Sequence, residues 1–400
     1  MIGRIWLVTS SFPRWLGDPT SPFVLQLARD LKARGWGVEV LAPHAAGLRR
    51  RETLEGILVT RFRYAWPASR QTVCYRGGAL FNLRREPANW LKLPTLAACQ
   101  WLALWRLVRV RPCDVIHAHW ILPQGLIALL VGRLRGIPVV ITAHGSDVFA
   151  LRGGLWRWLK RFALRRAAAV VVNSSATESA VRVIAPDIRD VRRIHMGVAK
   201  PRVAGPRTQR NGPVLVFVGR LVAQKGVVDL LQALAILRNK WPTASAVIVG
   251  GGPELGSLKS CAKELAIEDR VRFVGAVDPV RVPGYLAAAD VFVAPSTGPE
   301  GQGLAIIEAM LAGTPVVASR GGGVVDAVRE GETGLLVDEG APAQIAAAVA
   351  RLLQDRGLAE RLATRARAMA VQTYSTDRTA DAYARLFADV LACWPKRATP

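Results

Sequence analysis

The sequence predicts an α/β fold with two domains, each built on a mostly parallel sheet. Short apolar, β-branched runs alternate with longer segments of helical periodicity along the chain. The alternation restarts near residue 214, after residues 200–213, which are rich in proline, glycine and arginine and which we interpret as a linker. A length of 400 residues suits two or three domains with large hydrophobic cores.

In the first half, an apolar run at residues 5–9 predicts the first strand. A helix is expected over residues 22–34, because Phe23, Leu27 and Leu31 share one side and Gly35 ends the pattern. Further strands are predicted at residues 38–42, 114–120, 139–143, 170–174 and 194–198. Residues 44–112 give no clear pattern.

In the second half, apolar runs predict strands at residues 214–218, 246–249, 271–274, 290–293 and 315–318, and glycine-rich turns follow several of them. Helices are expected at residues 304–311 and, near the C-terminus, at about 374–394.

The number and spacing of the cysteines argue against disulfide bonding and against zinc binding. They are five in number and form no C-x-x-C pair, which argues against a disulfide framework and a zinc site and for a reducing compartment. No stretch resembles a secretory signal, and no run reaches the ~18 apolar residues of a membrane span. We therefore expect a cytoplasmic protein.

The positive charge is unevenly distributed. Residues 1–200 hold 31 Lys and Arg against 11 Asp and Glu, whereas residues 201–400 hold 23 against 19, and ten of the twelve tryptophans lie in the first half. Basic charge combined with tryptophan suggests an anionic membrane surface or a nucleic-acid surface. Two stretches, residues 89–109 and 155–166, are both basic and tryptophan-rich. In the second, Leu155, Trp158 and Phe162 share one helix side, which either packs on the core or lies on an anionic leaflet.

Residues 294–310 carry the pattern richest in chemistry. A buried strand leads into a glycine-containing loop and then a helix, the geometry in which helix-start N–H groups face an anion. Gly301 and Gly303 allow close approach of a ligand. Glu300 and Glu308 would be repelled by phosphate, but they suit the hydroxyl groups of a sugar and a ribose. A nucleoside diphosphate sugar satisfies all three features.

The same residues resemble the signature of the retaining glycosyltransferases of family 4. The resemblance is carried by Glu300-Gly301-x-Gly303-Leu304, by Glu308 and by the following Gly-Thr-Pro-Val-Val-Ala strand. It implies the GT-B fold, in which two Rossmann-like domains face a central cleft. Residues 1–200 would bind the acceptor and residues 201–374 the nucleotide sugar. Residues 375–400 would form a helix that returns to the N-terminal domain.

The resemblance also assigns roles in the first domain. Polar residues follow two predicted strands, at the sheet edge where α/β proteins bind ligands. By the resemblance, His119 contacts the donor sugar or its phosphate, and Gly17, His144 and Asp147 are candidates for the acceptor side. A buried core histidine is the alternative for each histidine and is favoured for His117. The spacing could also suggest metal ligands, but a third strong ligand is not evident, and the family needs neither metal nor cofactor for this step.

In the second domain, a strand is followed by Gly219-Arg220 and then by Lys225, a further family motif. Arg220 and Lys225 would neutralise the diphosphate, together with the amides near Gly303 and Leu304. The resemblance implies same-face attack by the acceptor, whose proton passes to the leaving diphosphate. Glu300 would then hold the sugar hydroxyls, Glu308 the ribose, and His119 would assist at the sugar.

The predicted function is transfer of a sugar from a UDP- or GDP-sugar to an acceptor. The expected acceptor is a lipid-linked saccharide used in cell-surface polysaccharide synthesis, at the cytoplasmic face of the membrane. Three alternatives remain open. They are transfer to a soluble sugar phosphate or glucan, nucleotide-sugar epimerisation, and non-catalytic nucleic-acid binding driven by charge. We expect no specific nucleic-acid partner, and the sequence gives no oligomeric state.

Overall fold

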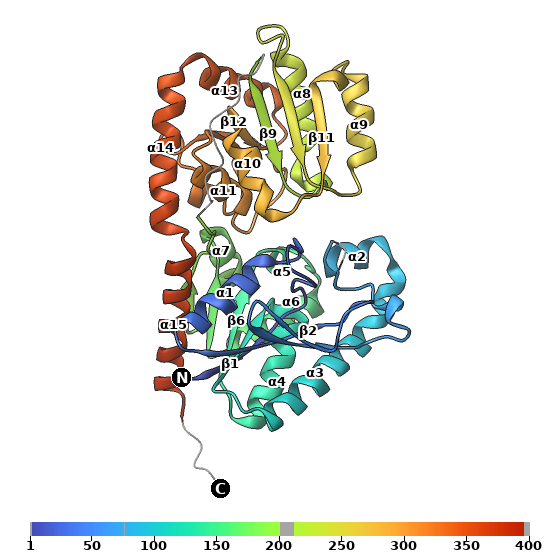
Figure 1. Ribbon diagram of the computed structural model, residues 1–400. Coiled ribbons are helices and arrows are strands. Elements are labelled where there is room, and N and C mark those ends of the chain that lie inside the picture. The colour runs from blue at the N-terminus through green and yellow to red at the C-terminus, as the bar shows by residue number, and fades with distance from the viewer. Residues whose placement is uncertain (1, 76, 201–211, 396–400) are drawn as a thin grey trace. The chain divides into compact units, whose positions relative to one another are not determined.

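The computed structural model describes residues 2–75, 77–200 and 212–395. The chain divides into two compact units. Unit 1 comprises Met1–Gly197 and Thr376–Pro400, and unit 2 comprises Val198–Ser375. Each unit is a parallel sheet with helices on both faces, which confirms the predicted α/β class (Figure 1). Most of the predicted linker, residues 200–213, lies outside the described residues.

The sheet of unit 1 has the strand order β3-β4-β2-β1-β5-β6-β7-β8, and its neighbours are parallel except for β3 and β4. A parallel sheet is buried on both faces, which explains the continuous β-branched runs of its central strands. The strands are β1 (Arg4–Val8), β2 (Gly37–Pro43), β3 (Arg51–Leu54), β4 (Ile57–Phe62), β5 (Val115–His119), β6 (Val139–Ala143), β7 (Ala169–Val172) and β8 (Val191–Arg193).

Alternate residues of β1 enter two cores on opposite faces of this sheet. Ile5 and Leu7 pack with α1 and α15, and Trp6 and Val8 belong to the core beneath α3, α4, α6 and α7. The C-terminal helix α15 therefore packs beside α1, as predicted (Figure 1). The helices are α1 (Pro22–Ala33), α2 (Ala79–Arg85), α3 (Leu93–Val110), α4 (Leu126–Arg135), α5 (Ser146–Phe149), α6 (Gly154–Arg166), α7 (Ser175–Ile184) and α15 (Thr376–Cys393).

One segment of unit 1 had no predicted structure, and one strand differs from the prediction. Residues 44–112, which show no clear pattern in the sequence, contain the β3–β4 hairpin, whose two turn residues, Glu55 and Gly56, both have positive φ. Such a turn matches the twist of paired strands, and a glycine at this place is its sequence signal. The strand expected at residues 194–198 lies instead at Val191–Arg193, and the expected residues follow it.

Helix α6 packs on the core through a side other than the one that carries Leu155 and Trp158. Its buried residues are Lys160, Ala163 and Leu164, whereas Leu155 and Trp158 are 65 % and 60 % exposed. The Lys160 ammonium group donates hydrogen bonds to the carbonyls of Val148 and Ala150, which satisfies its charge inside the core. Of the two alternatives for this helix side, packing of Leu155 and Trp158 on the core is therefore not the one that the structure shows.

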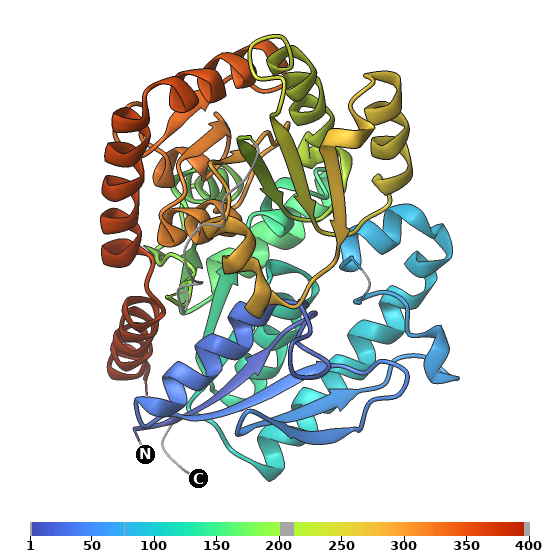
Figure 2. The same cartoon turned by 45° about the horizontal axis from the view of Figure 1, so that its top comes forward.

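The sheet of unit 2 has the strand order β11-β10-β9-β12-β13-β14 and is parallel throughout. Helices α8, α9 and α13 pack on one face and α10 and α11 on the other, and α14 contributes residues to both cores (Figure 2). The strands are β9 (Val214–Val218), β10 (Ser245–Val249), β11 (Val271–Gly275), β12 (Val291–Ala294), β13 (Val316–Ser319) and β14 (Leu335–Val337). The helices are α8 (Val227–Leu237), α9 (Leu255–Glu264), α10 (Val282–Ala287), α11 (Leu304–Ala312), α12 (Val324–Ala327), α13 (Pro342–Gln354) and α14 (Arg356–Thr373).

Candidate active site

The carboxyl ends of β9 and β12, neighbouring strands in unit 2, bring the predicted donor-binding loops together. The loop after β9 contains Gly219, Arg220 and Lys225, and the Gly219 N–H donates to Val249 on β10. Gly226 closes this loop at φ +60°, and a Cβ there would lie 1.9 Å from the carbonyl oxygen of Pro295. The close backbone contact therefore requires glycine, and it fixes the β9 loop against the β12 loop.

Lys225 and Glu300 form an ion pair across these two loops. The Ser296 hydroxyl donates to the same carboxylate oxygen of Glu300 at 2.7 Å. Burial alone would raise the pKa of Glu300, but the positive charge and hydrogen bond of Lys225, the Ser296 hydroxyl and the charge of Arg220 together hold that pKa below its usual value. Glu300 is therefore ionised, and two cations lie near it. The sequence did not predict this pairing or the role of Ser296.

Backbone contacts with the turn at residues 321–323 hold the loop that carries Glu300. The Glu300 carbonyl accepts the N–H of Gly323 at 2.8 Å, and a Cβ on Gly322 would lie 2.3 Å from the same carbonyl oxygen. Gly301 lies between this anchored residue and the start of α11. The triple-glycine turn at residues 321–323 thus supports the candidate site.

Helix α11 begins at Leu304, after Gly303 in the left-handed conformation with φ +75° and ψ 55°. A residue with a Cβ would be strained there, so glycine permits this sharp entry into the helix. The first N–H groups of a helix have no partner within it and carry the positive end of the helix dipole. The amides at Leu304 therefore favour an anion, as the sequence predicted from the strand–loop–helix pattern.

Glu308 lies in the next turn of α11 and is half-buried. Burial raises the pKa of its carboxyl group to about 7, and no other group contributes to this shift. Burial of a carboxylate is unfavourable unless charge or hydrogen bonds compensate it, and the raised pKa of Glu308 reflects that cost. The hydroxyl groups of a ligand would offset the cost by donating hydrogen bonds to Glu308.

In unit 1, three histidines gather at the carboxyl ends of β5 and β6. His119 is 1 % exposed, and its Nδ1 lies 2.9 Å from Nε2 of His144, with the two rings stacked. The Nε2 atom of His119 is buried and has no partner. Burial lowers the pKa of His119 well below its usual value, so the ring is neutral. Its predicted contact with the donor stays a prediction.

His117 is a core histidine, but its partner is a side chain and not the backbone. Its Nε2 lies 2.7 Å from the hydroxyl of Thr142, which in turn lies 2.9 Å from the hydroxyl of Tyr383 on α15. Burial lowers the pKa of His117 to about 3 and that of His144 also to about 3, so both rings are neutral. This chain of contacts fixes β5, β6 and α15 relative to one another, and no sequence pattern predicted the part that Tyr383 plays in it.

Asp147 and Gly17 occupy different surroundings. Asp147 is buried, and its carboxylate accepts the N–H groups of His144 at 3.0 Å and of Ile121 at 2.9 Å. It thereby organises the loops that follow β5 and β6. Gly17 has φ +82° and lies in the loop after β1. Within the residues that the structure describes, no cluster of His, Cys, Asp and Glu is able to hold a metal ion.

Comparisons with known proteins match both units. Residues 204–369 match the family model "Glycosyl transferases group 1", and residues 20–197 match "Glycosyl transferase 4-like domain". The chain is 33 % identical over 361 residues to 2-deoxystreptamine glucosyltransferase of Streptomyces kanamyceticus, covering 83 % of this chain and 89 % of the relative.

Two other relatives differ in what they act on. Glycogen synthase of Mycobacterium tuberculosis is 32 % identical, with 68 % of each chain covered. The GDP-mannose-dependent alpha-(1-6)-phosphatidylinositol monomannoside mannosyltransferase of Mycolicibacterium smegmatis is 30 % identical, with 69 % of this chain and 75 % of the relative covered.

Solved structures share the fold along nearly the whole chain. Sucrose-phosphate synthase from Thermosynechococcus elongatus superposes with a TM-score of 0.79 at 23 % identity, covering 97 % of this chain and 99 % of that one. Anabaena HepE in complex with UDP-glucose gives a TM-score of 0.76 at 21 % identity, with 97 % and 100 % covered.

Proposed function

Because this chain belongs to the family 4 glycosyltransferases of GT-B fold, retaining enzymes that use nucleoside diphosphate sugars, we propose that it transfers a sugar to a lipid-linked saccharide in cell-surface polysaccharide synthesis. Because the chain belongs to a family of glycosyltransferases, epimerisation and non-catalytic nucleic-acid binding are not proposed as its main activity. The relatives act on lipids, glucans and small molecules, so family membership does not specify the acceptor. The lipid-linked acceptor is therefore what the proposal adds.

The observation that carries the donor assignment is the Lys225–Glu300 pair beside the start of α11. Lys225, Arg220 and the Leu304 amide would stabilise the diphosphate as its charge grows during bond cleavage. The bond from the anomeric carbon to the diphosphate breaks on the same face on which the acceptor oxygen bonds, and the departing diphosphate takes the acceptor proton. Glu300 would hold the sugar hydroxyls, Glu308 the ribose, and neutral His119 would assist at the sugar.

A thermal-shift screen with UDP-glucose, GDP-mannose and ADP-glucose tests the donor site. A donor at a hundred times its dissociation constant stabilises the folded state by about 2.7 kcal/mol. For a unit of this size, that stabilisation raises the melting temperature by about 5–10 °C. Glucose 1-phosphate, which lacks the nucleoside and one phosphate, serves as the control and should give a much smaller shift. Absence of a shift with all three donors would contradict the donor assignment.

The support for a membrane-bound acceptor is the exposed side of α6. There, Leu155 and Trp158 lie in solvent on a helix that also exposes Arg157, Arg161 and Arg165. Two of these arginines, Arg161 and Arg165, share the carboxylate of Asp187, at 3.7 and 2.8 Å. Tryptophan and leucine at the headgroup boundary, with arginines contacting anionic lipids, are typical of interfacial helices. No helix in the described part of the chain is long and apolar enough to cross a membrane.

Flotation with phosphatidylserine-containing liposomes should recover the wild-type protein in the vesicle fraction at low salt. The Leu155→Ser/Trp158→Ser variant should bind at least tenfold less, because it loses the apolar contact while keeping the arginines. The matched control is Val280→Ser/Ile236→Ser, which removes exposed apolar residues from unit 2. Equal recovery of both variants would contradict the role of α6.

A second candidate is transfer to a soluble acceptor. It is favoured by the similarity to 2-deoxystreptamine glucosyltransferase, which covers more of this chain than either of the other two relatives. Turnover with a soluble cyclitol or sugar, undiminished in the Leu155→Ser/Trp158→Ser variant and unaffected by liposomes, would establish this alternative.

A further inference from the structure

The loop after β1, residues 9–21, combines a buried base with an exposed tip. Phe12 and Asp18 are buried, whereas Trp15 and Leu16 between them are 53 % and 69 % exposed. The loop begins at the carboxyl end of β1, which lies between β2 and β5 in the sheet. This is the sheet edge at which parallel α/β units bind ligands. The donor-site assignments give Trp15 no role.

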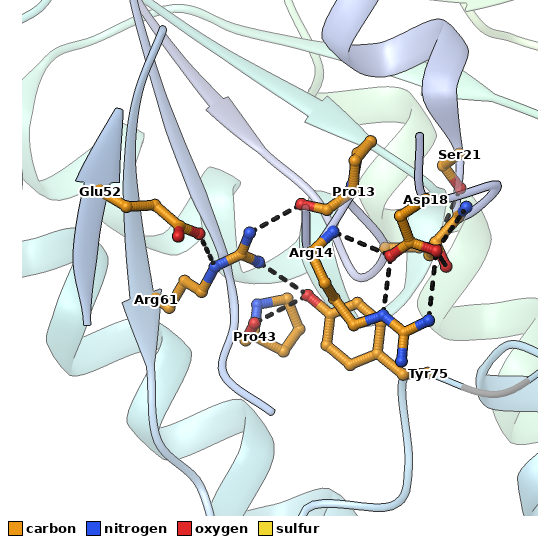
Figure 3. A network of polar contacts seen from close by, with 10 residues as sticks. Pro13, Arg14, Asp18, Ser21, Pro43, Glu52, Arg61 and Tyr75 are labelled. Carbon is orange, nitrogen blue, oxygen red and sulfur yellow. Dashed lines mark hydrogen bonds and ion pairs between the residues drawn. The ribbon is translucent and has the colours of Figure 1, made fainter. Parts of the chain in front are cut away.

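A buried arginine anchors the near side of this loop. Arg61 on β4 is 1 % exposed, and its guanidinium group donates to the Pro13 carbonyl at 2.7 Å, to Glu52 at 2.6 Å and to the Tyr75 hydroxyl at 3.1 Å (Figure 3). The Arg61 guanidinium group therefore finds three acceptors inside the protein. The backbone just before Trp15 is therefore tied to β4 by a charged donor.

A second arginine fixes the tip itself. The Arg14 side chain donates to both carboxylate oxygens of Asp18, at 2.7 and 3.2 Å, and Asp18 also accepts the Arg14 N–H at 2.8 Å (Figure 3). The Thr20 hydroxyl and N–H donate to Asp18 as well. Burial would raise the pKa of Asp18, but these donors outweigh it and lower that pKa. The ionised carboxylate of Asp18 thus accepts hydrogen bonds from both sides of the loop tip and holds the loop together.

Arg14 also orients the indole ring of Trp15. Its guanidinium carbon lies 4.3 Å from the centroid of the Trp15 ring and 5.4 Å from that of Tyr75. A cation over an aromatic face holds the ring in place. Trp15 is consequently an exposed aromatic surface on a fixed support, so that a ligand binding to it need not order the loop.

We propose that Trp15 is the stacking platform for a saccharide or cyclitol ring of the acceptor. This inference rests on the proposed glycosyltransferase function and specifies the chemistry of its acceptor. A pyranose or cyclitol ring presents an apolar C–H face of the size of an indole, and its hydroxyl edge stays in water. The charge of Arg14 is neutralised by Asp18, so this tip lacks the unpaired positive charge that an anionic membrane would select. The acceptor would therefore be recognised by a ring and not only by a phosphate or a lipid chain.

The test uses the full chain labelled with 5-fluorotryptophan, saturated with UDP, and titrated with n-octyl β-D-glucoside, maltose and myo-inositol. The Trp15 fluorine resonance is assigned by its loss in Trp15→Phe. We expect a saturable shift of this resonance with at least one ring compound, and no comparable shift with n-octyl phosphate. A Trp15 resonance that does not move with any ring compound overturns the proposal.

Steady-state transfer to the ring compound that binds gives the second readout. Trp15→Ala should raise the KM for that acceptor about tenfold or more, whereas Trp15→Phe should recover most of the affinity. Leu16→Ala, in the same exposed tip, is the matched control and should leave that KM unchanged. The donor KM and the thermal shift with donor should be the same in all three variants.

These readouts separate the two proposals. A wild-type protein that binds no donor refutes the proposed function itself. Normal donor binding together with an unchanged acceptor KM in Trp15→Ala refutes only the role of Trp15.

Discussion

Replacing Lys225 with alanine is expected to lower turnover about a hundredfold or more, with a smaller loss of donor affinity. The expectation follows from the proposed function, in which Lys225, paired with Glu300 in the loop before α11, would stabilise the charge that grows on the leaving diphosphate. Loss of one preorganised donor to a developing anion raises the barrier by about 3 kcal/mol in comparable sites. Arg220→Ala should have an effect of similar size. The charge of Arg220 helps to lower the pKa of Glu300, so Arg220 lies near the same site as Lys225.

The ion pair with Glu300 complicates this variant, because removing Lys225 leaves a half-buried carboxylate with one partner fewer. An unpaired carboxylate beside a diphosphate would repel it. Comparison of the Lys225→Ala/Glu300→Gln double variant with Glu300→Gln alone separates the two effects, because Glu300 itself is proposed to hold the sugar hydroxyls. If Lys225 only neutralised Glu300, the two variants would turn over equally. If Lys225 stabilises the diphosphate, the double variant would be much slower than Glu300→Gln.

The measurement is kcat and KM for the donor under saturating acceptor, with Lys240→Ala as the control for loss of a lysine on the surface of the same unit. Thermal melting of each variant without ligand shows whether the fold is intact. A Lys225→Ala enzyme with near-normal kcat would remove the diphosphate assignment.

The sequence predicted the parallel strands well because a strand buried on both faces must be apolar throughout. The run Val214–Val218 and the turn after it identified one edge of the candidate site, and Gly303 identified the other. Each of these positions has a local physical cause, namely burial of a strand or a backbone conformation that needs glycine. Such causes are visible in the sequence alone.

Contacts between distant segments were not predictable in this way. The pairing of Lys225 with Glu300 joins two loops 75 residues apart, and Thr142 meets Tyr383 across 241 residues. The apolar periodicity of α6 also misled, because Lys160 is the residue that enters the core, where two carbonyls accept its hydrogen bonds. Periodicity records which side is apolar, but the partners available in the fold decide which side is buried.

Replacing Glu308 with glutamine should weaken donor binding and at the same time stabilise the unliganded protein. The pKa of Glu308 is raised by burial to about 7 from the usual 4.5, so the folded protein holds this proton more tightly than the unfolded chain does. The resulting stability is present below about pH 4.5 and is lost as the pH rises through 7. At pH 8, Glu308→Gln should therefore raise the unfolding free energy by roughly 2 kcal/mol.

Donor binding should show the opposite preference. A ribose hydroxyl donates to an ionised carboxylate more strongly than to a neutral amide, by about 1 kcal/mol per hydrogen bond, so with two ribose hydroxyls the dissociation constant of UDP or GDP should rise about 10- to 100-fold in Glu308→Gln. In the wild type, affinity should fall as the pH decreases below 7, because the carboxyl group must first lose its proton. In Glu308→Gln, affinity should be flat across this range.

Calorimetric titration of the nucleotide between pH 6 and 8, alongside thermal melting without ligand, measures both effects. Glu360→Gln, an exposed glutamate on α14, is the matched control and should change neither quantity. A purely structural role for Glu308 would alter the melting temperature but leave the pH dependence of nucleotide binding intact. Unchanged affinity in Glu308→Gln would contradict the ribose assignment, whereas a stabilised protein that binds nucleotide weakly would show that this half-buried carboxylate is maintained for its ligand at the expense of stability.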